Sequence, residues 1–206
     1  MRRPRTVFGP FALICALVLG FALGRYEPPA QPEHAELTKG SKHRAQPVQQ
    51  NTRPRAEPSQ IGRLIVPVQG VTRRDLIDTW GETRSEGRIH EGIDIMAPEG
   101  ARVRAAADGR IVKFFDSVRG GLTIYQFDPS ERFVYYYAHL RARANGLAEG
   151  DVVRQGDVIG YVGQTGNAPV PHLHFEIQLL GPERRWWEAR SMNPYPYLIS
   201  GRAPVG

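Results

Sequence analysis

Residues 122–140 read LTIYQFDPSERFVYYYAHL. Two runs rich in β-branched and aromatic residues, 122–127 and 133–140, flank the triplet Asp128-Pro129-Ser130, which is typical of turns. Neither run has the 3.6-residue period of a helix. The stretch therefore predicts two antiparallel strands joined by a short turn.

The same pattern continues on both sides of this hairpin. Short apolar runs alternate with the turn dipeptides Asp108-Gly109, Gly120-Gly121, Glu149-Gly150 and Gln155-Gly156. Only one short helix is expected, near 72–78. Further strands are expected at 63–68, 102–106, 110–115, 151–153, 158–162 and 173–180.

These connections are too short for crossover helices, so the fold class is all-β, a small antiparallel sheet or sandwich. The expected domain, 61–206, is long enough to bury an independent core.

The first sixty residues have a different composition. Residues 1–24 hold three early arginines and an uncharged run at 7–23, which predicts a membrane anchor, with a cleaved export signal as the alternative. Residues 25–60 are rich in Pro, Gln and charged side chains, and they are expected to be a disordered linker. The sequence thus predicts an exported protein, held at the inner membrane with its domain facing the periplasm or cell wall, or released into the periplasm after cleavage.

Charge and cysteine content exclude several classes of protein. The formal net charge is +6, but residues 1–60 hold nine basic and four acidic side chains, whereas residues 61–206 hold 18 and 17. The expected domain is nearly neutral, which argues against a nucleic-acid partner. The single Cys15 excludes an intramolecular disulfide framework and a cysteine-rich metal site.

The expected domain contains four histidines, each in a setting that suggests chemistry. His90 and Asp94 flank a glycine in HEGID (90–94), His139 follows three tyrosines, and His172 and His174 lie two residues apart. Residues two apart on a strand project from the same face, and Leu173 and Phe175 would then anchor the strand in the core. Such a pair of imidazoles can supply one metal ligand and one neighbouring base.

Two imidazoles and one carboxylate form a ligand set that suits Zn²⁺ and leaves a fourth position open for water. A lone H-x-x-x-D or a lone sheet histidine is more often accidental or structural. The combination, with no spare histidine in the domain, favours a zinc site. The glycine between His90 and Asp94 is expected to let the backbone bend so that both side chains converge.

The order of the motifs resembles the lysostaphin-like, or LytM-type, zinc metallopeptidases that cut peptidoglycan. The resemblance covers residues 80–198, more than half of the chain. Besides HEGID, it is carried by WGETR (80–84), DIMAPEG (94–100), ADGRIV (107–112), YAHL (137–140), VRQGDVIG (153–160), GQTGN (163–167), PHLHFE (171–176) and NPYPYL (193–198).

The resemblance implies that His90, Asp94 and His174 ligate one Zn²⁺ per domain. It implies that His139 and His172 are catalytic and line the open position of the metal. The implied substrate is an amide of a stem peptide or cross-bridge of peptidoglycan. The implied fold is a small antiparallel β domain of barrel-sandwich-hybrid type, with a groove whose floor bears these residues.

One segment departs from the family pattern. Many members have a Gly- and Ser/Thr-containing loop before the PHLH motif, whereas this chain reads NAPVP (167–171). The expected ligands are unaffected, but contacts at the rim of the groove are expected to differ. Trp186 and Trp187 could stack on a ligand or cover the edge of the core, and packing is favoured because aromatic side chains bury large areas.

Three other functions remain as alternatives. A non-catalytic relative that binds peptidoglycan and activates other wall hydrolases would keep the fold but lose ligands, and this chain keeps all five positions. A biotinyl or lipoyl carrier needs an exposed lysine at a turn, whereas the domain has only Lys113, within an expected strand. A structural spacer would not require four histidines in motif positions. The bond that is cut, the oligomeric state and any regulatory partner are not readable from the sequence.

Overall fold

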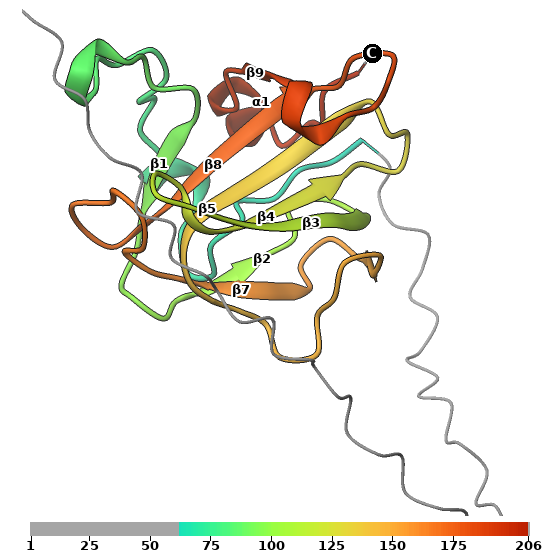
Figure 1. The fold of residues 1–206 in the computed structure, drawn as a ribbon, viewed down its shortest axis with the longest axis horizontal. Helices are drawn as coiled ribbons and strands as arrows, with labels where there is room; N and C mark the ends of the chain where they lie inside the picture. Colours follow the sequence, from blue (N-terminus) through green and yellow to red (C-terminus); the bar gives the residue numbers. More distant parts are fainter. Residues whose placement is uncertain (1–61, 206) are drawn as a thin grey trace, which may run out of the picture. The chain divides into compact units, whose positions relative to one another are not determined.

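The computed structural model describes residues 62–205 of the chain. In this part nine strands form one sheet, and every strand pair in it is antiparallel (Figure 1). The all-β, antiparallel prediction is therefore confirmed. The strands are β1 (Ile93–Met96), β2 (Arg102–Arg104), β3 (Gly109–Ser117), β4 (Gly121–Phe127), β5 (Phe133–Arg143), β6 (Val152–Val153), β7 (Val158–Val162), β8 (His172–Leu179) and β9 (Arg190–Met192).

The long strand β5 organises the sheet. The main path runs β1-β8-β5-β4-β3-β6, while β7 pairs with both β5 and β2, and β9 pairs with β8. From Phe133 to Ala138, β5 pairs with β8, but from Leu140 to Arg143 it pairs with β7. His139 lies between these two parts, with a left-handed backbone (φ 60°) that is uncommon outside glycine. One edge of β5 therefore changes its partner at a histidine that the sequence marks as functional.

Apolar and polar side chains alternate along β8, so that one face of the strand packs in the core and the other does not. Leu173, Phe175 and Ile177 are fully buried, as the sequence predicted for the first two. The rings of Tyr135 and Tyr137 from β5 lie 6.3 and 5.3 Å from that of Phe175. Because successive side chains of a strand point to opposite faces, the intervening residues form a polar row on the other face. This row consists of His172, His174, Glu176 and Gln178.

The hairpin of residues 122–140 forms as predicted. Phe127 of β4 lies opposite Val134 of β5. The Asp128 carboxylate closes the turn by accepting hydrogen bonds from the backbone N–H groups of Arg132 and Phe133, at 2.9 and 2.8 Å. An Asp at the first position of a turn satisfies backbone donors that would otherwise lack partners.

One predicted strand is absent, and two strands were not predicted. Residues 63–68 make only isolated bridges, Arg63 to Arg202 and Val68 to Val103, although Leu64, Val66 and Val68 are buried. The strands β1 and β9 were missed, because runs of four and three residues carry too little period to be recognised.

The expectation of a single short helix also needs correction. The segment near 72–78 forms only a 3₁₀ turn, Arg73–Asp75, while further 3₁₀ turns lie at Ser85–Gly87 and Trp186–Glu188. An α-helix, α1, spans Tyr195–Ser200 and ends at Gly201, whose φ of 69° suits glycine.

The predicted membrane segment (1–24) and linker (25–60) lie outside the described residues. Among the residues that the structure describes, no helix is long and apolar enough to cross a membrane.

Candidate metal centre

A pocket of about 610 Å³ lies over the polar row of β8. Its floor is formed by β8 and the neighbouring part of β5, and three loop segments line it. These segments are 84–91 ahead of β1, 119–120 between β3 and β4, and 167–170 ahead of β8. All five predicted site residues line this pocket: His90, Asp94, His139, His172 and His174.

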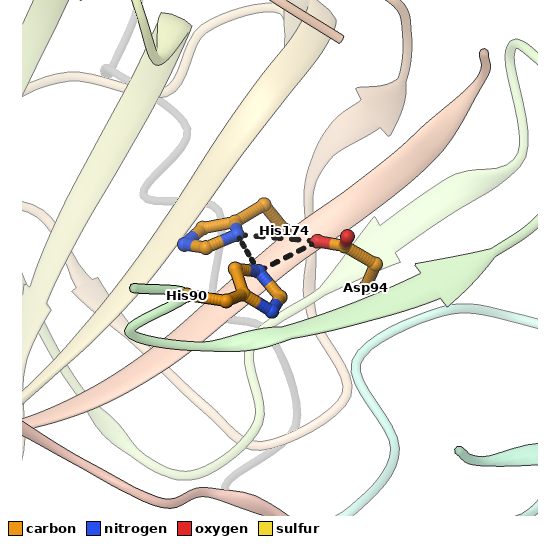
Figure 2. A group of neighbouring side chains, drawn as sticks. All are labelled: His90, Asp94 and His174. Atoms are coloured by element: carbon orange, nitrogen blue, oxygen red, sulfur yellow. Dashed lines mark hydrogen bonds and ion pairs between the residues drawn. The ribbon is translucent and has the colours of Figure 1, made fainter. Parts of the chain in front are cut away.

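The predicted ligands His90, Asp94 and His174 come together at the floor (Figure 2). His90 lies on the segment before β1, while Asp94 on β1 lies directly opposite His174 on β8. His90 Nε2 is 2.9 Å from His174 Nδ1, and these two atoms lie 3.1 and 3.2 Å from Asp94 Oδ1. The antiparallel register thus brings together residues that are 84 positions apart in the chain.

These separations fit a zinc ion. Donor atoms at 2.0–2.1 Å from a tetrahedral Zn²⁺ lie about 3.3 Å from one another. The three observed separations are close to this value, and two imidazoles with one carboxylate are donors that zinc accepts. The residues present therefore fit the metal that the resemblance implies.

Hydrogen bonds determine which nitrogen of each histidine can face the pocket. His90 Nδ1 lies 2.6 Å from the Thr79 carbonyl, and His174 Nε2 lies 2.8 Å from Glu176 Oε1. Arg84 Nη2, which can only donate, also lies 2.7 Å from His90 Nδ1. In both rings the protein thus engages the outer nitrogen, which leaves His90 Nε2 and His174 Nδ1 as the nitrogens that can bind a metal once they are deprotonated. These are the two atoms that approach Asp94.

The two predicted catalytic histidines are arranged in the same way. His139 Nδ1 lies 2.8 Å from the Thr165 carbonyl, and His172 Nδ1 lies 2.8 Å from the Val170 carbonyl. Each ring therefore keeps Nε2 as its acceptor. The two ring centroids are 4.8 Å apart, and His172 Nε2 is 3.4 Å from Asp94 Oδ1. Both imidazoles thus border the three-residue cluster.

Burial and neighbouring charges shift the pKa values in the pocket. Burial, reinforced by the nearby rings of His174 and His172, lowers the pKa of His139 to about 4, so this imidazole is neutral near pH 7. Burial opposes ionisation of Asp94, but the rings of His172, His174 and His90, whose nitrogens lie 3.1–3.4 Å from its Oδ1, prevail and hold its pKa far below the usual range. Burial likewise opposes protonation of His174, whereas Asp94 and Glu176 raise its pKa to about 9.

Sequence reasoning assigned no role to Arg84 and Glu176. The Arg84 Nη2 group donates to Asp94 Oδ2 at 2.7 Å, so the oxygen that does not face the histidines is held in place. The buried Glu176 carboxylate accepts from His174. Glu176 could have been found from its spacing, because it lies two residues after His174 and shares its face of the strand. Arg84 offered no such signal, because a loop brings it to Asp94.

The expected role of Gly92 needs correction. Its φ is not in the left-handed region, so the backbone there does not need a glycine to bend. An added Cβ would instead lie 2.6 Å from the Phe175 carbonyl oxygen and 2.8 Å from ring atoms of His174. Gly92 is therefore required for the close approach of the segment before β1 to β8.

Two other expectations concern the surroundings of the pocket. The departing segment 167–171 does line the rim, through Asn167, Ala168, Pro169 and Val170. The Trp186 ring packs 4.5 Å from the Tyr125 ring on the sheet, as the packing interpretation expected, whereas the Trp187 side chain is 63% exposed.

Sequence comparison finds relatives among peptidases. An L-Ala–D-Glu endopeptidase of Bacillus subtilis is 36% identical over 147 residues, 67% of this chain and 44% of that protein. The DD-carboxypeptidase/endopeptidase Mpg of Neisseria meningitidis is 39% identical over 126 residues, 61% of this chain and 26% of that protein. The chain thus spans less than half of the length of either relative.

The solved structures agree in fold. The catalytic domain of lysostaphin from Staphylococcus simulans superposes with a TM-score of 0.53 at 27% identity, covering 61% of this chain and 94% of that domain. The sequence pattern of peptidase family M23 matches residues 88–194, from just before His90 to the end of the NP dipeptide that precedes α1. The chain belongs to peptidase family M23.

Proposed function

We propose that this protein is a zinc-dependent endopeptidase that hydrolyses an amide bond in the peptide part of peptidoglycan. The observation that carries the proposal is the cluster of three donor atoms, 2.9–3.2 Å apart, with two further histidines beside it. The relatives named as an L-Ala–D-Glu endopeptidase and a DD-carboxypeptidase/endopeptidase support the same reaction class.

The chain's own residues supply positioning and proton transfer. A Zn²⁺ held by His90, Asp94 and His174 would polarise the scissile carbonyl and lower the pKa of water towards about 7. Neutral His139, with Nε2 as acceptor, can take a proton from the attacking water and return it to the leaving amine. His172, once protonated at Nε2, can donate to the developing negative charge on the carbonyl oxygen.

The alternative is a non-catalytic peptidoglycan-binding regulator. The complete set of five histidine and aspartate positions favours the enzyme, because a regulator needs none of them for binding. The two functions differ in whether a zinc-loaded chain cuts its ligand.

The test uses the purified full chain beside His174→Ala, His139→Ala and the control His43→Ala, which lies outside the described residues. Zinc content is measured by atomic absorption, and each protein is incubated with intact peptidoglycan sacculi. The released fragments are identified by mass. We expect wild type and His43→Ala to hold one zinc and to open peptide bonds. His174→Ala should lose both properties, whereas His139→Ala should keep zinc and lose turnover by about 10²–10⁴-fold.

Zinc without cleavage by the wild type would favour the regulator. Full activity of a zinc-free His174→Ala protein would contradict the ligand assignment.

We also propose that the domain acts outside the cytoplasm. This rests on the arginines before the uncharged run 7–23 and on the proposed substrate, which lies in the cell wall. Fractionation of cells, with the N-terminal residue of the membrane-bound and released forms determined, would distinguish an anchor from a cleaved signal.

A further inference from the structure

Two arginines border the pocket from opposite sides. Arg88 lies on the segment before β1, and Arg119 lies on the connection between β3 and β4. Both line the pocket. In the sheet order β1-β8-β5-β4-β3, the floor strands β8 and β5 lie between β1 and β4. The segments that carry the two arginines therefore lie on either side of the floor strands.

One carboxylate of the protein itself lies between them. Glu86 Oε2 is 3.9 Å from Arg88 Nε and 3.9 Å from Arg119 Nη2. Charge-assisted hydrogen bonds between arginine and carboxylate are normally about 2.7–2.9 Å long. Glu86 thus makes long ion pairs with both arginines and a close hydrogen bond with neither. Arg88 Nη2 donates to Ser85 Oγ at 3.1 Å, whereas Arg88 Nε is buried and has no hydrogen-bond partner among the described residues.

Glu86 is also easily displaced. Its side chain is 76% exposed, and its backbone has a left-handed φ of 64°, which is costly for a residue with a Cβ. An exposed ion pair of this kind contributes little to stability. A carboxylate from outside could replace it at small cost.

The acids on the floor do not neutralise these arginines. Asp94 is held by Arg84 and the histidines, and Glu176 by His174, Ser191 and Gln178. Glu91, which is exposed, is the remaining acid among the residues that line the pocket. The mouth is therefore suited to an anionic ligand.

We propose that Arg88 and Arg119 bind a carboxylate of the substrate at the position that Glu86 occupies. The preferred substrate is then a stem peptide with a free carboxylate near the scissile amide, and not an uncharged glycine cross-bridge. The planar guanidinium group is the donor best suited to a carboxylate, because it presents paired N–H groups. This inference rests on the proposed function and specifies its substrate.

The test compares cross-linked stem peptides that differ in one group. One form keeps both the α-carboxylate of D-glutamate and the free carboxylate of diaminopimelate, and two others carry a primary amide at one position or the other. A pentaglycine-bridged peptide is the fourth substrate. Values of kcat and KM are measured for the full chain, for Arg88→Gln, Arg119→Gln and Glu86→Gln, and for the control Arg102→Gln, an exposed arginine on β2.

We expect each of Arg88→Gln and Arg119→Gln to raise KM for the free acid by about 3- to 10-fold with little change in kcat. Neither substitution should change the KM of the substrate whose recognised carboxylate is amidated. Comparing the two amidated substrates shows which carboxylate that is. Glu86→Gln removes the internal competitor and should lower KM for the free acid. Arg102→Gln should behave as wild type.

Cleavage of all four substrates with equal KM by the wild type overturns this inference and leaves the proposed function intact. If the arginine variants change KM equally for the free and amidated substrates, this inference is also overturned and the proposed function is not. No cleavage of any substrate or of sacculi overturns the proposed function and this inference with it.

Discussion

Glu176 is a buried carboxylate with three hydrogen-bond donors around it. Its Oε1 accepts from His174 Nε2 at 2.8 Å, and its Oε2 accepts from Gln178 Nε2 at 2.7 Å and from Ser191 Oγ at 2.5 Å. A carboxylate that accepts from the outer nitrogen of a ligating histidine holds the ring in position and makes its other nitrogen more basic. Glu176 is therefore a positioning residue for His174.

Replacing Glu176 by Gln should weaken zinc binding about 10- to 100-fold. All three neighbours donate hydrogen bonds to the Glu176 carboxylate. A glutamine has an –NH₂ donor in place of one of its oxygens, so at least one of the three hydrogen bonds is lost. Zinc affinity is measured by competition with a chromophoric chelator, and circular dichroism checks the fold. The control is Glu149→Gln, whose carboxylate pairs with Lys113 on the surface at 3.0 Å. An unchanged zinc affinity of Glu176→Gln would show that the contact has no positioning role.

The pairing of β1 with β8 sets the geometry of the site at the level of elements. β1 has only four residues, yet its register places Asp94 opposite His174. Gly92 permits this pairing, since any side chain there would collide with the backbone of Phe175 and the ring of His174. The same small residue thus controls both the strand pair and the metal cluster.

Gly92→Ala should lower the free energy of unfolding by about 1–3 kcal/mol, because the added methyl group forces β1 away from β8. Zinc affinity should fall with it, since Asp94 and His174 move apart. Both are measured, the first by urea denaturation. The matched control is Gly181→Ala, which meets open space and has no left-handed φ. Equal stability of the two variants would contradict the close-approach argument.

For the whole molecule, the metal would connect parts that the chain separates widely. His90, Asp94 and His174 come from the segment before β1, from β1 and from β8, and the unfolded chain would not bring them together. A ligand that binds only the folded state stabilises it by mass action. The folded domain should therefore respond to zinc as a unit.

Zinc at about 100 times its dissociation constant should stabilise the folded chain by about 2.7 kcal/mol. For a domain of this size, that corresponds to a rise in Tm of about 5–10 °C. Calorimetry of the metal-free protein with and without zinc measures the rise, and EDTA should reverse it. Asp94→Asn should remove most of the response. A rise of the same size in that variant would place the zinc elsewhere.

The sequence predicted much of the fold where a pattern is local. The hairpin of 122–140 and the alternation along β8 depend on side chains two residues apart, so composition and period suffice to recognise them. The strands β1 and β9 could not be recognised, because they are strands only by virtue of pairing with β8. The strand prediction for residues 63–68 was wrong for the opposite reason, because apolar side chains can be buried in a segment that pairs with no strand.

By itself, the sequence identified the residues that we propose carry the chemistry: one aspartate and four histidines in a nearly neutral, all-β domain that contains no cysteine. These residues can be recognised from the sequence because each short motif lies within one turn or one strand. Only the tertiary structure decided that His90, Asp94 and His174 converge, that Arg84 and Glu176 hold two of them, and that Glu86 lies between two arginines. These contacts join distant segments, and their geometry depends on register and loop packing that no local pattern encodes.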